Sequence, residues 1–568
     1  MSDTLHSLLS PPDLPSSGRY NWGRLYGSAQ GLAIAQAVQA ASGPVVLLTQ
    51  DAPTAMRLEY ELQFYLGAAL DKFPIQHFPD WETLPYDRFS PHQDIISQRL
   101  SALSSLPGFK RGVLIVPITT LMLRVVPHSY LDGHSLVMDT GQSLNINEMR
   151  RQLEASGYLC VSTVMEHGEF AVRGSIVDLF PMGSEMPYRL DLFDDEVESI
   201  RVFDPETQRT EHKVEKIRLL PAREYSLNKD GIKRFRQAYL SAFEGDPSRS
   251  LIYADVSSGL SPAGLEYYFP LFFDNTATLF DYLPADSLIL SVDDIDNSAQ
   301  RFWDEIGERY EQRRHDLERP ILPPQVLYQR IEELFGNLKK YPRIQLERFE
   351  QTDKVGNHNF ATGMPASVNL DVHAGHPTKA LQAYLNEYQG RVLFAAESTG
   401  RREVLLELLK GCDLYPTTFD SWQAFLASDA RHGITVANID SGCVLIDDKI
   451  SIIAEAQLFG PHAVNRRRKK ARHKDADAMV RNLAELEVGA PVVHEDSGVG
   501  RYLGLQKIEL GGIEQEFLTL EYAGGDKLYV PVVSLHLISR YSGASPEGAP
   551  LHKLGSGQWE KAKRKASE

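Results

Sequence analysis

The chain has 568 residues, of which 42% are hydrophobic and 24% charged, and its formal net charge is −17 at pH 7. This length is too great for one hydrophobic core and predicts roughly three to five domains of ordinary globular composition. The acidic balance excludes a protein that attracts nucleic acid over its whole surface, so any DNA contact must be local.

The cysteines and the hydropathy pattern indicate the cellular compartment in which the protein is expected. Cys160, Cys412 and Cys443 are far apart and odd in number, which fits neither a disulfide framework nor a zinc site. The sequence contains no apolar run long enough to span a membrane and no secretory signal. We therefore expect a cytoplasmic protein in a reducing environment, without a metal site and without a membrane partner.

Residues 19–134 carry buried apolar strands that alternate with helices, which is typical of a parallel sheet in an α/β domain. Helices are predicted where apolar residues recur at helical spacing, and strands where apolar residues follow one another in short runs. The expected strands lie at 44–48 and 112–117, and the expected helices at 32–41, 52–66 and 119–125.

The turn into the first helix, GSAQGL at 27–32, is where a nucleotide-binding loop would lie. Such a loop has two glycines separated by four residues, then a lysine that neutralises phosphate and a hydroxyl that holds Mg²⁺. Here three residues separate Gly27 from Gly31, and Leu32 and Ala33 replace the lysine and the hydroxyl. The full motif occurs nowhere in the sequence, so the residues predict no catalytic site and no bound nucleotide or metal cofactor.

Residues 80–100, DWETLPYDRFSPHQDIISQRL, resemble a segment of the bacterial transcription-repair coupling factors, which are related to the excision-repair helicase UvrB. At the equivalent place UvrB has a tyrosine-rich hairpin that probes damaged DNA. The present segment is shorter and is interrupted by prolines. We therefore expect Trp81, Tyr86 and Phe89 to pack in the core, with DNA probing as the alternative.

The next segment, 165–205, predicts three short strands, at 175–180, 188–193 and 197–203. In the second strand, alternation places Leu190 and Leu192 on the inner face and Arg189 and Phe193 on the outer face. An exposed aromatic residue beside an arginine is the composition of a protein-binding hot spot. From the pattern alone, the more common case is a purely structural role, in which Phe193 packs into a second core and Arg189 pairs with Asp191.

Two sequences in this segment, EHGEFAVRGSIVDLFP and YRLDLFDDEVESIRVFD, resemble the small second domain of UvrB and, more closely, that of the coupling factors. In that family the domain docks onto UvrA, the damage-recognition ATPase. The resemblance implies that Arg173, Arg189 and Phe193 bind UvrA, and it favours the hot-spot interpretation.

Residues 221–350 return to the first domain, with helices expected at 235–243, 297–317 and 328–338. The aromatic stretch PAGLEYYFPLFF at 262–273 also resembles the coupling factors and is expected to fill a joint between sub-domains. Residues 351–460 predict a separate α/β unit with no assigned chemistry. The basic run at 466–474 either contacts phosphates or forms a solvated linker.

Residues 484–546 predict an all-β barrel, because short strands are separated by the glycine turns at 511–512 and 524–525. This segment resembles the Tudor-like module shared by the coupling factors and the CarD regulators, which binds the β subunit of RNA polymerase. The resemblance implies that Ile508 contacts polymerase. The alternative is that Ile508 belongs to the core of the barrel.

Together these features predict a multidomain α/β plus all-β protein. It comprises a degenerate UvrB-like helicase lobe with an inserted small α+β domain, a middle α/β domain and a Tudor- or SH3-like β barrel. The predicted segments are domain 1A at 19–134, domain 2 at 135–220, domain 1B at 221–350, the middle domain at 351–460, a basic linker at 461–483, the polymerase-interacting domain at 484–546 and the start of a connecting helix at 547–568.

The resemblance implies transcription-coupled nucleotide excision repair, with UvrA and the polymerase β subunit as partners. In that family a translocase motor binds double-stranded DNA, ATP and Mg²⁺, and we expect that motor to lie outside this sequence. The chain itself is therefore expected to be non-catalytic. The alternatives are a UvrB-type helicase with an unusual nucleotide loop and a CarD-type transcription regulator.

Overall fold

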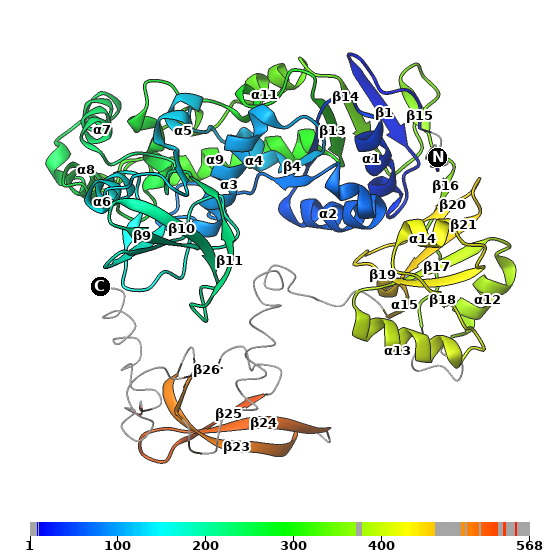
Figure 1. Ribbon diagram of the computed structural model, residues 1–568. Helices are drawn as coiled ribbons and strands as arrows, with labels where there is room; N and C mark the ends of the chain where they lie inside the picture. Colours follow the sequence, from blue (N-terminus) through cyan, green and yellow to red (C-terminus); the bar gives the residue numbers. More distant parts are fainter. Residues whose placement is uncertain are drawn as a thin grey trace. The chain divides into compact units, whose positions relative to one another are not determined.

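The computed structural model describes residues 8–9, 11–370 and 378–459, and towards the C-terminus 489, 491–494, 497–510, 513–531, 538–540, 551 and 553. The chain divides into two compact units, Met1–Pro461 and His462–Glu568 (Figure 1). The basic run at 466–474 lies outside the described residues. Within them, no helix is long and apolar enough to cross a membrane.

A seven-stranded sheet forms the centre of the first unit, and all neighbouring strands in it are parallel, as predicted. The strand order is β15-β1-β14-β13-β2-β4-β3. Strands from the predicted domain 1A (19–134) and domain 1B (221–350) belong to this one sheet. Its last strand lies at 357–359, beyond the predicted end of domain 1B at residue 350. Its strands are β1 Arg19–Gly23, β2 Val45–Thr49, β3 Ile75–His77, β4 Val113–Pro117, β13 Leu288–Val292, β14 Arg343–Leu346 and β15 Asn357–Asn359.

Helices cover both faces of this sheet. In β2, Val45 and Leu47 pack with α1 and α2, while Val46 and Leu48 pack into the core formed with α3, α4 and α9. Burial on both faces explains why this strand is an unbroken apolar run. The helices are α1 Ala29–Ala40, α2 Ala52–Leu66, α3 Gln93–Ser105, α4 Ile118–Met122, α9 Ile295–Arg313, α10 Pro324–Leu327 and α11 Ile331–Leu338.

The aromatic residues of the 80–100 segment divide between core and surface. Trp81 and Tyr86 are buried, as predicted, and pack against Tyr267 of the 3₁₀ helix η4 (Leu265–Phe272). The prediction was wrong for Phe89, whose side chain is 70% exposed. No helix or strand spans 78–92, so no regular spacing determined which of these side chains turn inward.

A six-stranded sheet in the order β11-β10-β9-β8-β7-β6 forms the inserted domain (Figure 1). Its inner face, including Leu190 and Leu192, joins the core of the first domain. The strands are β6 Leu159–Cys160, β7 Glu169–Arg173, β8 Ile176–Leu179, β9 Tyr188–Phe193, β10 Glu196–Phe203 and β11 Thr210–Val214. A separate antiparallel pair is formed by β5 Leu136–Asp139 and β12 Lys216–Leu219. The remaining helices of this part of the chain are α5 His128–His134, α6 Ile146–Ala155, α7 Lys229–Ala242 and α8 Leu251–Ser257.

The middle domain is an α/β unit around a second six-stranded sheet, in the order β16-β20-β21-β17-β19-β18. Its strands are β16 Thr362–Gly363, β17 Arg391–Ala396, β18 Thr417–Thr418, β19 His432–Val436, β20 Val444–Leu445 and β21 Ile450–Ala454. Its helices are α12 Lys379–Glu387, α13 Thr399–Lys410, α14 Trp422–Leu426 and α15 Glu455–Phe459.

The C-terminal unit is all-β in its described residues, with five strands in the order β25-β24-β23-β22-β26. Pro531 ends the edge strand β25, which suits a residue without a backbone N–H group. The described strands form an open antiparallel sheet, and no closed barrel is found among them. They are β22 Pro491–His494, β23 Gly498–Leu510, β24 Ile513–Glu521, β25 Lys527–Pro531 and β26 Ile538–Arg540.

Candidate functional site

The outer face of the inserted sheet is built around a buried carboxylate. Asp178 on β8 lies opposite Arg189 on β9 and has no exposed surface. Arg189 donates from Nε to Oδ1 at 2.6 Å and from Nη2 to Oδ2 at 2.9 Å. Hydrogen bonding to Asp178 raises the pKa of Arg189. A two-point contact of this kind fixes both the position and the plane of a guanidinium group.

The same carboxylate also holds Arg173, which donates from Nη2 to Oδ2 of Asp178. The Arg173 side chain is 50% exposed, whereas that of Arg189 is 18% exposed. Arg189 additionally lies over the ring of Phe203, 4.9 Å from its centroid. One carboxylate therefore orients two guanidinium groups, and the three side chains together carry one formal positive charge.

Phe193 lies on the same face, at the end of β9, with 71% of its side chain exposed. A second small core does exist on this face, formed by Val164, Ala171, Phe180 and Phe203. Phe193 is not part of it, so the alternative in which this ring packs into a second core is wrong.

The alternative ion pair between Arg189 and Asp191 is also wrong. Strand register decides this, because β9 places Arg189 opposite Asp178 and places Asp191 opposite Ile176. Asp191 instead accepts a hydrogen bond from Ser199 at 3.0 Å and lies 3.7 Å from Arg201.

The structure thus brings Arg173, Arg189 and Phe193 to one face of one sheet, which we call the docking face. The sequence analysis missed Asp178. Its signal is an acidic residue inside an otherwise apolar strand, IVDL at 176–179, where an ionised side chain needs a partner.

In the glycine turn at the start of α1, backbone N–H groups are hydrogen-bonded to other parts of the protein. The backbone N–H of Ser28 donates to the carbonyl oxygen of Ser441 at 3.0 Å, and that of Gly31 donates to Glu61 Oε2 at 3.1 Å. Burial raises the pKa of Glu61, against the effect of Arg57 at 2.7 Å. Protein acceptors therefore occupy two N–H groups that a phosphate-binding loop would direct at its ligand, and the residues do not fit ATP.

Ile508 lies on β23 and pairs with Gln515 of β24, but its side chain is outside the described residues. Among the residues that the structure describes, no group of three or more His, Cys, Asp or Glu side chains could hold a metal ion.

Three family models match separate parts of the chain. The UvrB interaction domain matches residues 136–225, which include the docking face. The D3 domain of MFD matches residues 384–458, and the CarD-like/TRCF RID domain matches residues 486–542.

Relatives match the chain along nearly its whole length. A transcription-repair-coupling factor of Escherichia coli is 46% identical over 96% of this chain and 47% of its own length. One from Haemophilus influenzae is 43% identical over 98% and 48%, and one from Bacillus subtilis is 24% identical over 95% and 46%. The chain spans about half the length of the curated relatives it matches. The three domain matches in this order, and the similarity along nearly the whole chain, relate it to the matched half of the transcription-repair-coupling factors.

Proposed function

We propose that this chain acts in transcription-coupled nucleotide excision repair, as the part of a coupling factor that holds two partners. The docking face binds UvrA, and the CarD-like domain binds the β subunit of RNA polymerase. The observation that carries the proposal is the exposed Phe193 beside two arginines oriented by Asp178, on a domain that matches the UvrB interaction domain. An aromatic anchor beside ordered arginines is the composition of an interface hot spot.

At the other partner site, we propose that the CarD-like sheet is part of a small Tudor-like barrel in which Ile508 contacts polymerase. Support comes from the family match over residues 486–542 and from the position of Ile508 on the long hairpin strand β23. Substitution of Ile508 by Asp should weaken binding to polymerase β by ten-fold or more, since a charge in an apolar contact is costly. A binding titration against purified β subunit measures this, and unchanged affinity would refute the assignment.

The chain should also lack ATPase activity of its own. Support comes from the loop at Gly27, where the lysine of a nucleotide loop is missing and protein acceptors take the N–H groups of Ser28 and Gly31. ATP, Mg²⁺ and most of the double-stranded DNA binding would belong to a motor outside this sequence. Phosphate release with ATP and DNA should equal that of a protein-free blank, and clear turnover would favour the UvrB-type helicase.

A further inference from the structure

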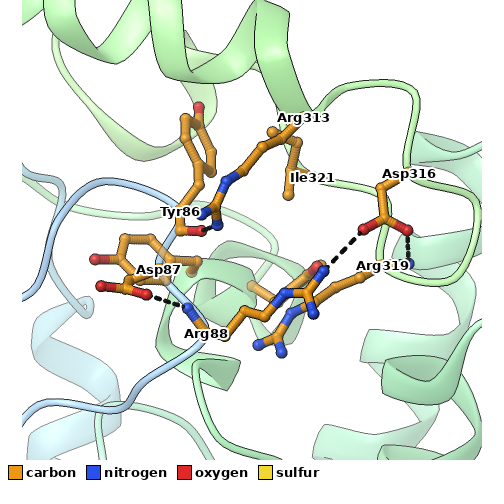
Figure 2. Close-up of a pocket in the computed structure, with 9 residues that line it drawn as sticks. Tyr86, Asp87, Arg88, Arg313, Asp316, Arg319 and Ile321 are labelled. Atoms are coloured by element: carbon orange, nitrogen blue, oxygen red, sulfur yellow. Dashed lines mark hydrogen bonds and ion pairs between the residues drawn. The ribbon is translucent and has the colours of Figure 1, made fainter.

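A small polar pocket lies where three distant segments of the first unit meet, at 86–88, 267–268 and 313–321 (Figure 2). Its volume is about 160 Å³, and its lining consists of three arginines, three tyrosines, two aspartates and one isoleucine. Figure 2 shows Arg313 reaching from the end of α9 to the backbone of Tyr86, and Arg88 extending towards Asp316. None of these residues belongs to the docking face or to the glycine turn.

The charges of this pocket are incompletely balanced. Arg88 pairs with Asp316 at 3.4 Å, and the other oxygen of Asp316 accepts the backbone N–H groups of residues 318 and 319 at 3.0 Å. Arg313 donates to the carbonyl oxygen of Tyr86, and Arg319 donates to that of Ala263. Within the described part of the chain, no ion pair is formed by Arg313 or Arg319. Three guanidinium groups thus face two carboxylates, which leaves a formal excess of one positive charge.

The anchoring bonds position these guanidinium groups without using all their donors. A guanidinium group carries five N–H donors in a rigid fork. Arg313 bonds to one carbonyl oxygen, and Arg319 bonds to a carbonyl oxygen and to the hydroxyl of Tyr268, so several donors of each remain available. Because Arg313 and Arg319 are held by the backbone at 86 and 263, their orientation is set before any ligand arrives. Forks of this kind match the oxygens of a phosphate group.

Size and aromatic packing restrict the ligand further. Pockets for small organic molecules usually measure roughly 300–1,000 Å³, so this one suits a single oxyanion group. Tyr86, Tyr267 and Tyr268 are each at most 3% exposed, and the rings of Tyr86 and Tyr267 lie 6.1 Å apart. These buried rings offer no open face on which a nucleic-acid base could stack. The pocket therefore favours phosphate over base or sugar.

We propose that this pocket binds a phosphate group through Arg88, Arg313 and Arg319. The group is either one phosphodiester of a nucleic-acid strand or a free phosphate ion, because both present the same oxygens. Binding of a strand here is independent of base sequence and weakens as salt is added. It gives an otherwise acidic chain one local contact for nucleic acid, and it is independent of the partners proposed above.

Two probes and three variants of the full chain test this proposal. Inorganic phosphate binding is followed by phosphorus NMR, and binding of a short fluorescein-labelled single-stranded DNA by fluorescence anisotropy at two salt concentrations. The variants are Arg88→Gln, Arg319→Gln and, as control, Arg314→Gln. Arg314 lies beside Arg313 in sequence and pairs with Glu311, but it does not line the pocket. The Arg88 side chain is 67% exposed, so its variant should fold normally.

Arg88→Gln and Arg319→Gln should each weaken binding roughly ten-fold, the usual effect of one charge-assisted hydrogen bond, while Arg314→Gln changes it less than about two-fold. Each pocket variant should also lower the salt slope for DNA, by at most about 0.7, which is the slope of one phosphate contact. Binding of both probes supports the site with a strand as its ligand, and binding of phosphate alone supports it with the free ion. The proposal is overturned if neither probe binds, or if Arg314→Gln weakens binding as much as Arg88→Gln.

Discussion

Asp178 is a buried carboxylate that orients two arginines of the docking face at once. Alternation along β9 was enough to predict that Arg189 and Phe193 lie on the outer face. It could not identify the partner of Arg189, which is 11 residues away in sequence and is selected by the register between β8 and β9. Single-strand patterns specify faces, whereas cross-strand pairs depend on how strands align.

Asp178→Asn should lower both stability and UvrA affinity, although Asp178 is fully buried and cannot itself touch a partner. The neutral amide cannot accept two charge-assisted bonds from Arg189, so we expect a loss of about 1–3 kcal/mol in unfolding free energy. Thermal melting and a UvrA titration measure the two effects.

Asp191→Asn is the matched control for that substitution. Asp191 lies on the same face, but its only ion pair among the described residues is a weak one, 3.7 Å from the partly exposed Arg201. Its effect on stability should stay below about 1 kcal/mol. If Asp178→Asn changes melting and UvrA affinity no more than Asp191→Asn does, the orienting role of Asp178 is wrong.

At the scale of elements, the turn that precedes α1 packs tightly against the middle domain. Gly27 has a φ of +55°, and a Cβ atom placed there would lie 1.9 Å from the carbonyl oxygen of Gly442. The sequence drew attention to this turn because it lacks the lysine and the hydroxyl residue of a nucleotide-binding loop. It could not reveal the contact with Gly442, because the two residues come together only in the folded chain.

Gly27→Ala should destabilise this contact, because the backbone of Gly442 must move to make room for the methyl group. The cost should exceed that of positive φ alone by about 1–3 kcal/mol. Gly18→Ala is the control, since Gly18 has a φ of +80° and open space around it. Amide hydrogen exchange at Ser28 and Gly31 should accelerate in Gly27→Ala alone. Equal exchange in both variants would contradict a close fit.

A second contact joins α3 to the turn before β7. His167 lies 2.7 Å from Asp94 through Nδ1 and 2.7 Å from the carbonyl oxygen of Ser184 through Nε2. The hydrogen bond from His167 lowers the pKa of Asp94 below its ordinary value. A lowered carboxylate pKa stabilises the fold above the ordinary value of about 4, and this stabilisation is lost as pH falls through the lowered pKa.

Asp94→Asn should therefore destabilise the protein near neutral pH, and the difference from the original protein should vanish as pH falls well below about 4. Melting temperatures across this acid range measure the effect. Asp296→Asn is the control, because Asp296 also lies in the first turn of a helix, α9. A difference that persists undiminished in acid, or that Asp296→Asn reproduces, would rule out the pairing with His167 as the cause.

At the scale of the whole molecule, the class of each described domain could be predicted because helical and strand periodicities are local properties. The parallel first sheet, the α/β middle domain and the all-β C-terminal sheet all agree with their patterns. Burial in irregular segments could not be predicted, as Phe89 illustrates, because it depends on which distant element packs there. The phosphate-sized pocket had no sequence signal for the same reason: its arginines come from two segments more than 200 residues apart.

Phe193 is the proposed anchor for UvrA, and a titration of purified UvrA against this chain measures its contribution. Phe193→Ala should weaken binding by about 30-fold or more, as expected of a hot-spot residue, without lowering the melting temperature. Phe89→Ala is the matched control, because that ring is 70% exposed compared with 71% for Phe193 and lies outside the docking face. Phe89→Ala should keep full UvrA affinity, whereas undiminished affinity in Phe193→Ala would refute the docking role of Phe193.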